Sequence, residues 1–344
     1  MPNIPLAVAG LGMVSCLGIG AAFNAAAMRC GYSGASTLSE QDERLVAQAP
    51  LPATQRGSER LVNVLLPAVQ EALQTLPAGA QVPLYVCTET NDLLRDPCPG
   101  LANILYQQLH KQPYAACIDY DHSKHVPQGR VSFVHALNWV QHQATQHQYH
   151  LVVGIASYLF PHSLNYYQGL GRLLGPDNPD AFIPGEAAVA VLLDTQPRGS
   201  TSVLLGHGLG TEPHPIDGDQ PITGDGLTAA VRAAEADSGV TSNATDFRIS
   251  SASGEAYFFR ELSIVHGRTL DDPKQDHPLW HPADHIGEVG AASGAAMVVM
   301  AHYAFQKNYA PGHTALCQLS NDDTQRAAYL IRYQPDGLGE TTQR

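Results

Sequence analysis

The chain has 344 residues, of which 44% are hydrophobic and 15% are charged, and its formal net charge at pH 7 is −13. This length is sufficient to bury a core, as one large domain or as two ordinary ones. The acidic balance excludes a basic nucleic-acid-binding surface. No stretch approaches the roughly 20 apolar residues of a membrane span. The N-terminal residues also lack the basic lead of a signal peptide, so we expect a cytoplasmic protein.

Apolar strands and amphipathic helices alternate along the first half of the chain. Residues 4–10 predict a short strand that ends in glycine turns, and residues 60–76 have apolar side chains at helical spacing. The remaining elements predicted for this half are a strand at 83–88, a helix at 130–146, and buried-type strands at 150–155 and 187–194.

The second half repeats this order of elements. Its predicted elements are a strand at 202–209, a helix at 226–237, a strand at 247–251, a helix from 290 and a strand at 315–319. Strands that are separated by helices favour a layered α/β fold with largely buried sheets.

Two segments occupy matching places in the halves. They are GRVSFVHALNWV (129–140) and GAASGAAMVVMA (290–301), and each lies between two predicted strands. Glycine costs a helix interior about 0.5–1 kcal/mol relative to alanine, so the glycine-rich segment predicts a close backbone neighbour. We therefore expect two similar halves, 1–197 and 198–344, whose central helices cross at a pseudo-twofold axis.

Five segments, in chain order, resemble the β-ketoacyl synthase branch of the thiolase-fold superfamily. They are VAGLGMVSCLGIGAAFNAAAMRCGYSG (8–34), HLVVGIASYLFPHSL (150–164), AFIPGEAAVAVLLD (181–194), GDGLTAAVRAAEADSGV (224–240) and IGEVGAASGAA (286–296). This resemblance implies a thiolase-like α/β fold with five α-β-α-β-α layers. The chain is shorter than is usual for the family, which suggests trimmed loops over the substrate channel.

The resemblance also indicates where the family's catalytic cysteine and two histidines should lie. The cysteine position falls on Arg130, the first histidine on Ser251 or Ala252, and the second on Glu288. Arginine is neither a thiol-like nucleophile nor a base near pH 7. All three positions depart from the family's pattern, and a non-condensing protein is expected.

The candidate pocket consists of residues around these positions: Arg130, Ser132, Ser253, His285 and Glu288. If the two helix starts face each other, Arg130 and Glu288 form a buried ion pair that plugs the acyl site. Alternatively, each side chain points outward to water, and the sequence leaves both arrangements open. Ser132 is expected to cap or pack its helix, and His285 to cap the next one or turn toward the pocket.

The remaining chemical groups predict structural roles. The six cysteines are scattered, which favours free thiols, and Cys117 is expected to end a strand as a buried thiol. His122 and His125 form an i, i+3 pair beside Asp119 and Asp121. A metal site is conceivable, but no third ligand with suitable spacing is apparent, so a solvated loop is favoured. We predict neither a metal nor a cofactor.

Two functions follow from this interpretation. The favoured one is an accessory protein that binds a partner, an acyl chain or an acyl carrier protein without condensing. The alternative is an active 3-oxoacyl-acyl-carrier-protein synthase-type acyltransferase whose catalytic residues have moved. The resemblance implies a homodimer, or a heterodimer with a related synthase, joined through the strand 150–155, which would be a hazardous free edge.

Overall fold

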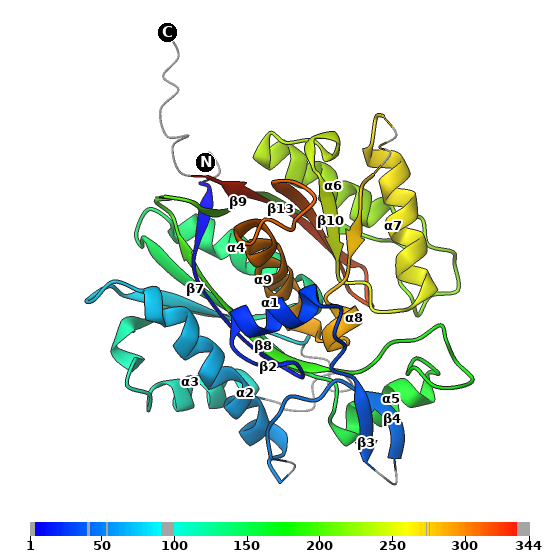
Figure 1. Ribbon diagram of the computed structural model, residues 1–344, viewed down its shortest axis with the longest axis horizontal. Helices are drawn as coiled ribbons and strands as arrows, with labels where there is room; N and C mark the ends of the chain where they lie inside the picture. The colour runs from blue at the N-terminus through cyan, green and yellow to red at the C-terminus, as the bar shows by residue number, and fades with distance from the viewer. Residues whose placement is uncertain are drawn as a thin grey trace.

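The structure is a computed structural model, which describes residues 4–39, 42–52, 54–90, 100–197, 199–272, 274 and 276–335 (Figure 1). The strands of the first half are β1 (Leu6–Ser15), β2 (Gly18–Ile19), β3 (Ser36–Ser39), β4 (Asp42–Val46), β5 (Val82–Thr88), β6 (Ile118–Pro127), β7 (Tyr149–Ser157) and β8 (Glu186–Asp194). Its α-helices are α1 (Ala21–Arg29), α2 (Gly57–Ala72), α3 (Leu101–Leu109), α4 (Ser132–Gln143) and α5 (Pro161–Gly169).

The second half continues with the same kinds of element. Its strands are β9 (Thr201–Thr211), β10 (Phe247–Ser250), β11 (Leu279–Trp280), β12 (Thr314–Ser320) and β13 (Gln325–Gln334). Its α-helices are α6 (Asp225–Ser238), α7 (Ala256–Thr269), α8 (Ala283–Ile286) and α9 (Ser293–Gln306). The element types predicted for both halves are confirmed, with shifted boundaries.

One continuous mixed sheet carries both halves, in the order β11-β10-β12-β13-β9-β1-β8-β7-β5-β6. The two halves of this sheet meet where β1 pairs with β9, through Leu6 and Ala7 only. The boundary predicted at 197/198 falls in the connection between β8 and β9. Since both strands belong to the same sheet, the division into two domains stays a prediction.

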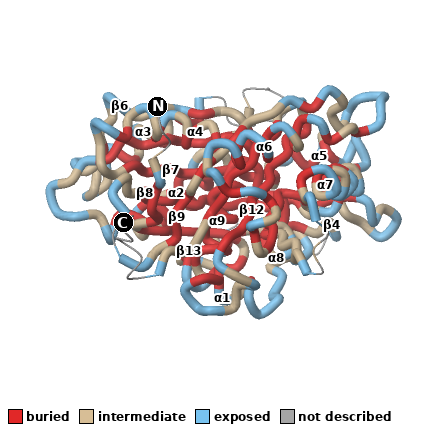
Figure 2. The backbone as a smooth tube through the Cα atoms, turned by 90° about the horizontal axis from the view of Figure 1, so that it is seen from above, coloured by how far each residue is buried: buried red, intermediate tan, exposed pale blue. Residues whose placement is uncertain are grey.

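Helices cover both faces of each half-sheet. The core between the half-sheets contains side chains of α1, α4 and α9, whereas α2 and α3 pack on the outer face of the first half-sheet, and α6 and α7 on that of the second (Figure 1). Strand β5 shows the alternation that this requires, because Tyr85 and Cys87 belong to the inner core and Leu84 and Val86 to the outer one. The interior strands and α9 are buried, and exposed residues lie at the periphery (Figure 2). The predicted five-layer order is thus confirmed.

The first strand differs from its prediction. Strand β1 does not end at the glycines but runs through Gly10 and Gly12 to Ser15. A Cβ atom on Gly12 would lie 1.9 Å from the carbonyl oxygen of Ala68 in α2. These glycines therefore allow a helix to lie directly on the strand, and they do not form turns.

The two matching segments lie side by side at the centre of the molecule. Each begins with a glycine of positive φ (61° at Gly129 and 49° at Gly290), passes through one 3-10 turn and continues as α4 or α9. A Cβ atom on Gly294 would lie 2.5 Å from Cβ of Phe133, so α9 approaches α4 as closely as the glycine-rich sequence predicted. The helix predicted at 130–146 starts at Ser132, because residues 129–131 form the 3-10 turn.

The strand predicted to join two subunits is not an edge strand. Strand β7 is hydrogen-bonded to β5 on one side and to β8 on the other, so it is an interior strand of the sheet and that prediction is wrong. The free edge of this half-sheet belongs to β6, which precedes α4. Among the described residues, no helix is both long enough and apolar enough to cross a membrane.

Candidate functional site

A buried ion pair lies where α4 and α9 begin. The side chains of Arg130 and Glu288 are 3% and 1% exposed, and Arg130 Nη2 lies 2.9 Å from Glu288 Oε2. Burial lowers the pKa of Arg130, but the carboxylates of Glu288 and Asp322 outweigh it and hold the pKa well above its usual value. Of the two arrangements left open by the sequence, the structure shows the buried ion pair.

Asp322 extends this pair into a network. Its Oδ1 accepts a hydrogen bond of 2.7 Å from Arg130 Nη1, and its two oxygens accept 2.9 and 3.0 Å bonds from Arg172. Arg172 also forms a bidentate pair with Glu255, with contacts of 2.6 and 2.8 Å. Although burial raises the pKa of Asp322, the two guanidinium groups hold it far below its usual range. The carboxylate is therefore ionised.

Glu89 completes the cluster from the end of β5. Its Oε1 accepts a 2.7 Å hydrogen bond from the backbone of Ala291, and its Oε2 accepts a 3.3 Å bond from the hydroxyl of Tyr158. Burial, partly opposed by Arg130, raises the pKa of Glu89 to about 7. Four carboxyl groups thus face two guanidinium groups, and the carboxyl of Glu89 can keep its proton near neutral pH.

The backbone donors at both helix starts are already occupied. Beside the bond from Ala291 to Glu89, the N–H of Gly290 donates to Glu288 Oε1 at 2.7 Å, and the N–H of Val131 donates to Asn321 Oδ1 at 3.3 Å. Donors at a helix start are the usual partners of an anion or a developing oxyanion. Here protein side chains accept these bonds instead.

Little space remains around these groups. The cavity lined by Glu89, Arg130, Tyr158, Tyr167 and Asp322 measures about 10 Å³, which is about the volume that one water needs. The guanidinium carbon of Arg130 also lies 5.4 Å from the centre of the Phe258 ring. The described residues therefore leave no room for an acyl chain at this position.

Ser132 has a structural role at the start of α4. Its Oγ donates to the carbonyl of Thr88 at 3.1 Å and accepts from the N–H of Gln128 at 2.9 Å. The hydroxyl links the turn before α4 to the end of β5. This arrangement agrees with the predicted capping or packing role.

The other predicted positions lie outside the cluster. Ser251 is buried, and its Oγ accepts from the backbone of Ser320 at 3.1 Å. Ala252 is also buried, and Ser253 Oγ has no partner among the described residues. His285 points away, because its Nδ1 lies 3.0 Å from the carbonyl of Tyr32 and it lines a different cavity. No described imidazole replaces the family's histidines at the ion pair.

The described cysteines do not supply an activated thiol at the site. Five are free, as predicted for this part of the chain, and Cys98 lies outside the described residues. Burial raises the pKa of Cys16 and of Cys317 to about 12. Cys117 is half-buried and precedes β6 in a 3-10 turn, so the prediction that it ends a strand is wrong.

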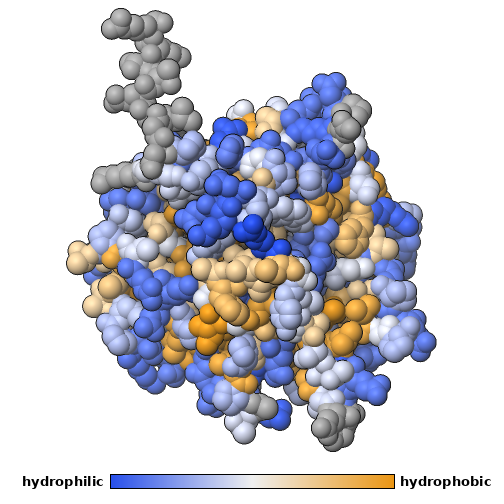
Figure 3. Space-filling model, in the orientation of Figure 1, coloured by the Kyte–Doolittle hydropathy of each residue, from blue (hydrophilic) through white to orange (hydrophobic). Residues whose placement is uncertain are grey.

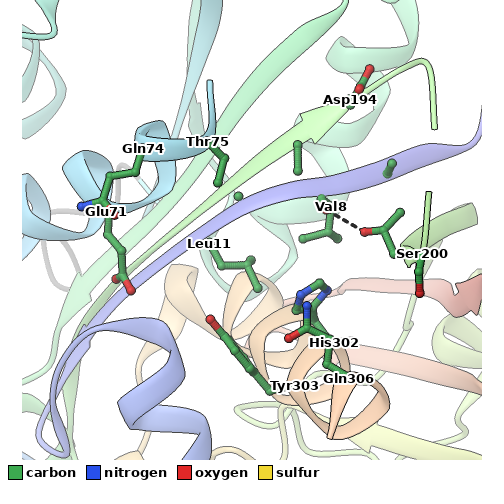
Figure 4. A pocket seen from close by; sticks show the side chains of 14 residues that line it. Val8, Leu11, Glu71, Gln74, Thr75, Asp194, Ser200, His302, Tyr303 and Gln306 are labelled. Atoms are coloured by element: carbon green, nitrogen blue, oxygen red, sulfur yellow. Dashed lines mark hydrogen bonds between the residues drawn. The ribbon is translucent and has the colours of Figure 1, made fainter. Parts of the chain in front are cut away.

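A larger cavity lies along the first half of β1. It measures about 490 Å³ and is lined by β1 and the last turns of α2 and α9 (Figure 4). Glu71 there accepts backbone bonds from Met13 and Ala21, which anchor the start of α1. His302 lies 3.0 Å from Ser202 Oγ, and burial lowers its pKa to about 4. Ser202 is fully buried and does not line this cavity, so its contact with His302 presents no nucleophile to a ligand there.

The predicted loop containing His122 and His125 is part of a strand. Both residues lie in β6, and His125 Nε2 is 2.8 Å from the hydroxyl of Thr88. His122 turns back onto Asp119, where His147 from the α4–β7 connection joins them. Among the described residues, these three side chains are the group of His, Cys, Asp or Glu that could hold a metal ion. The prediction of a plain solvated loop is therefore wrong.

Sequence reasoning missed four members of the buried cluster: Glu89, Arg172, Glu255 and Asp322. The sequence could have indicated two of them. Glu89 and Asp322 follow the ends of buried strands, on the side of the sheet where the central helices begin. Glu255 lies two residues after Ser253, which the sequence analysis had placed in the candidate pocket. Arg172 carried no comparable signal, since its segment matched no motif.

Comparison with solved structures identifies the fold. A complex of a type II PKS acyl-carrier protein with its ketosynthase bound to the hexaketide is similar over 96% of this chain and 100% of that one, with 16% identity and a TM-score of 0.78. The ishigamide ketosynthase/chain length factor is 16% identical over 97% of this chain and 100% of that one, with a TM-score of 0.75.

A β-ketoacyl synthase from Burkholderia phymatum is 13% identical over 97% of this chain and 100% of that one, with a TM-score of 0.70. No family model and no curated protein matches the sequence. The chain therefore has the thiolase-like ketosynthase fold, as its sequence predicted. Identities this low show the fold alone.

Proposed function

We propose that this protein is a non-condensing member of the ketosynthase fold that acts as a binding partner of other proteins. The observation that carries the proposal is the buried ion pair between Arg130 and Glu288. These are the residues that the sequence resemblance assigns to the positions of the family's nucleophile and one of its histidines. Arginine cannot form the thioester-like intermediate that acyl transfer requires. A carboxylate would also repel a developing enolate.

The alternative acyltransferase function requires an activated nucleophile elsewhere. Cys16 and Cys317 have raised pKa values of about 12, and a thiol of this kind is a poor source of thiolate near pH 7. The backbone donors of Gly290 and Ala291 are occupied by carboxylates. These observations support the non-condensing function over relocated chemistry.

Two features support a role in binding a partner. One similar structure is the ishigamide ketosynthase/chain length factor. We propose that this chain pairs with a second copy of itself or with a related synthase. Apolar residues also gather on the surface over α1 (Figure 3), where Ile19, Phe23 and Tyr32 are 55%, 59% and 61% exposed. Exposed apolar groups of this size often mark protein contacts. An acyl carrier protein or another accessory protein is a further candidate partner.

A condensation assay tests the proposal. A radiolabelled malonyl carrier and an acyl donor are incubated with the wild type, with Arg130→Cys, and with Arg130→Cys/Glu288→His. We expect no turnover above the no-protein control for the wild type or the single variant. The new thiol lacks both histidines, and Glu288, Asp322 and Glu89 would still surround it.

Turnover by the wild type would overturn the proposal and favour the acyltransferase alternative. Labelling with a chloroacetyl thiol probe, followed by intact mass, is an independent check, because a specifically modified cysteine would indicate a hidden nucleophile. Light scattering at micromolar concentration tests the pairing. A monomer that also fails to bind a co-expressed synthase would contradict the partner role.

A further inference from the structure

A four-residue bulge interrupts the edge strand β6. Strand β6 pairs in parallel with β5, but Asp119 is opposite Pro83 whereas Lys124 is opposite Tyr85. Four residues of β6 therefore face the single residue Leu84 of β5. Bulges commonly redirect a side chain next to a functional site.

Local hydrogen bonds hold the bulge in shape. Ser123 Oγ donates to the carbonyl of Asp119 at 2.6 Å and accepts from the N–H of Leu84 at 2.9 Å. The side-chain amide of Gln143, at the end of α4, donates to the carbonyl of His122 at 3.2 Å. The bulge is thus tied to the neighbouring strand and to the central helix.

This bulge brings His122 onto Asp119, and the α4–β7 connection adds His147. His122 Nδ1 and His147 Nε2 lie 2.8 and 3.0 Å from the same oxygen of Asp119, Oδ2. His147 is positioned by His150, whose Nε2 lies 3.0 Å from the His147 carbonyl and therefore donates to it. Three potential ligands from two separate segments thus converge on one point.

We propose that Asp119, His122 and His147 form a binding site for a divalent transition metal ion, with Zn²⁺ as the best-fitting candidate. Two imidazole nitrogens and one carboxylate oxygen are a common ligand set for Zn²⁺. Tetrahedral ligands at about 2.0–2.1 Å from the ion lie about 3.3 Å from one another. The three ligand atoms all lie within 4.8 Å of one another, so small side-chain rotations bring them to this spacing.

Charge and access are also suitable for such an ion. Asp119 supplies the acidic group of the site, and both imidazole nitrogens face its Oδ2. The side chain of His122 is 47% exposed, whereas those of Asp119 and His147 are 16% and 14% exposed. The site is open on one side, where a water can complete four-coordination. A bound ion would join β6 to the α4–β7 connection.

This site is independent of the buried cluster and of the proposed function. The full chain is first treated with a chelator and dialysed, and is then titrated with Co²⁺ and with Zn²⁺. Visible absorption of Co²⁺ reports the coordination geometry, and native mass spectrometry reports the stoichiometry.

We expect one ion per chain with micromolar or tighter affinity, and a tetrahedral-type Co²⁺ spectrum that Zn²⁺ abolishes. His122→Ala removes an exposed ligand without disturbing the fold, and should weaken binding at least about tenfold, as should His147→Ala. The control is His142→Ala, an exposed histidine on α4 outside the cluster, which should bind as the wild type does.

Three results would overturn the proposal. These are the absence of stoichiometric binding by the wild type, equal losses in His122→Ala and His142→Ala, and a cobalt–thiolate band that assigns the ion to a cysteine. Circular dichroism of each variant verifies that the fold is retained. If His147→Ala does not fold, His122→Ala and Asp119→Asn still decide the question, because both act at the edge strand.

Discussion

Two polar clusters lie near the opposite ends of α4, and they differ in their access to solvent. At the start of α4, Arg130 and Glu288 are 3% and 1% exposed. Near its end, His147 meets Asp119 and His122, and His122 is 47% exposed. The first cluster pairs opposite charges inside the protein, whereas the second leaves one side open to a ligand. When ionisable groups are fully buried they pair with one another and leave no space for a ligand. When one of them is exposed, the group can bind a ligand from solvent.

The largest expected change in stability comes from removing the guanidinium group of Arg130 from the buried cluster. Arg130→Ala leaves Glu288 and part of Asp322 buried without their partner, and we expect the free energy of unfolding to fall by about 3–5 kcal/mol. Urea denaturation measures this loss. Arg268→Ala, in a pair with Asp225 whose side chains are 44% and 61% exposed, is the matched control and should change stability by less than about 1 kcal/mol. Equal losses in the two variants would contradict the comparison.

A smaller effect concerns Glu89 and pH. Its folded-state pKa of about 7 is above the unfolded value, so the folded protein binds a proton that the unfolded chain releases. Stability from this group is therefore fully present below about pH 4.3 and is lost as the pH rises to about 7. Glutamine does not ionise, so Glu89→Gln should abolish this fall in stability with rising pH.

The measurement compares Glu89→Gln with the wild type by denaturation at pH 5 and pH 8. The stability of the variant relative to the wild type should rise with pH, by at most about 3 kcal/mol between the two limits. Tyr257→Phe, which changes a hydroxyl outside the Glu89 contacts, serves as a control with no comparable pH trend. A pH-independent difference for Glu89→Gln would mean that its carboxyl ionises normally.

The smallest expected change in stability comes from a substitution in the Asp119–His122–His147 cluster, measured without metal. His122→Ala removes one hydrogen bond to Asp119 at a partly exposed position, and should lower stability by less than about 1 kcal/mol at pH 7. This bond helps to lower the pKa of Asp119. Its contribution is present above about pH 3.9 and is lost as the pH falls through the lower folded-state pKa. Thermal unfolding of His122→Ala and of the wild type at pH 7 and pH 3 measures this difference in stability at each pH. A large loss at pH 7 would show that His122 is needed for the stability of the fold.

Patterns within single segments predicted much of the fold. Apolar periodicity indicated β5, β7, β8 and α6 with errors of a few residues, and the glycines of 290–294 indicated a close helix neighbour. Strand β6 was not recognised, because its charged sequence IDYDHSKHVP has the composition of a solvated loop. Pairing with β5 and the local bonds of the bulge, not apolar burial, make it a strand.

The candidate site was predictable only where a motif marked its position. Arg130 and Glu288 were found because each precedes a helix that resembles a known segment, but the sequence left open whether they face inward. Arg172 and Glu255 were missed because their pairing joins residues 83 positions apart. Their side chains meet only after the central helices and α5 have packed.

The sequence by itself determined the alternation of elements, the two glycine-led helix starts and the absence of a cysteine at the expected position, since these depend on residue type and short-range spacing. The tertiary structure alone decided that Arg130 is enclosed by Glu288 and Asp322, and that His147 joins Asp119 and His122. The physical reason is that ion pairs and metal ligands require specific distances of about 2–4 Å between atoms. Only the packing of distant segments produces those distances.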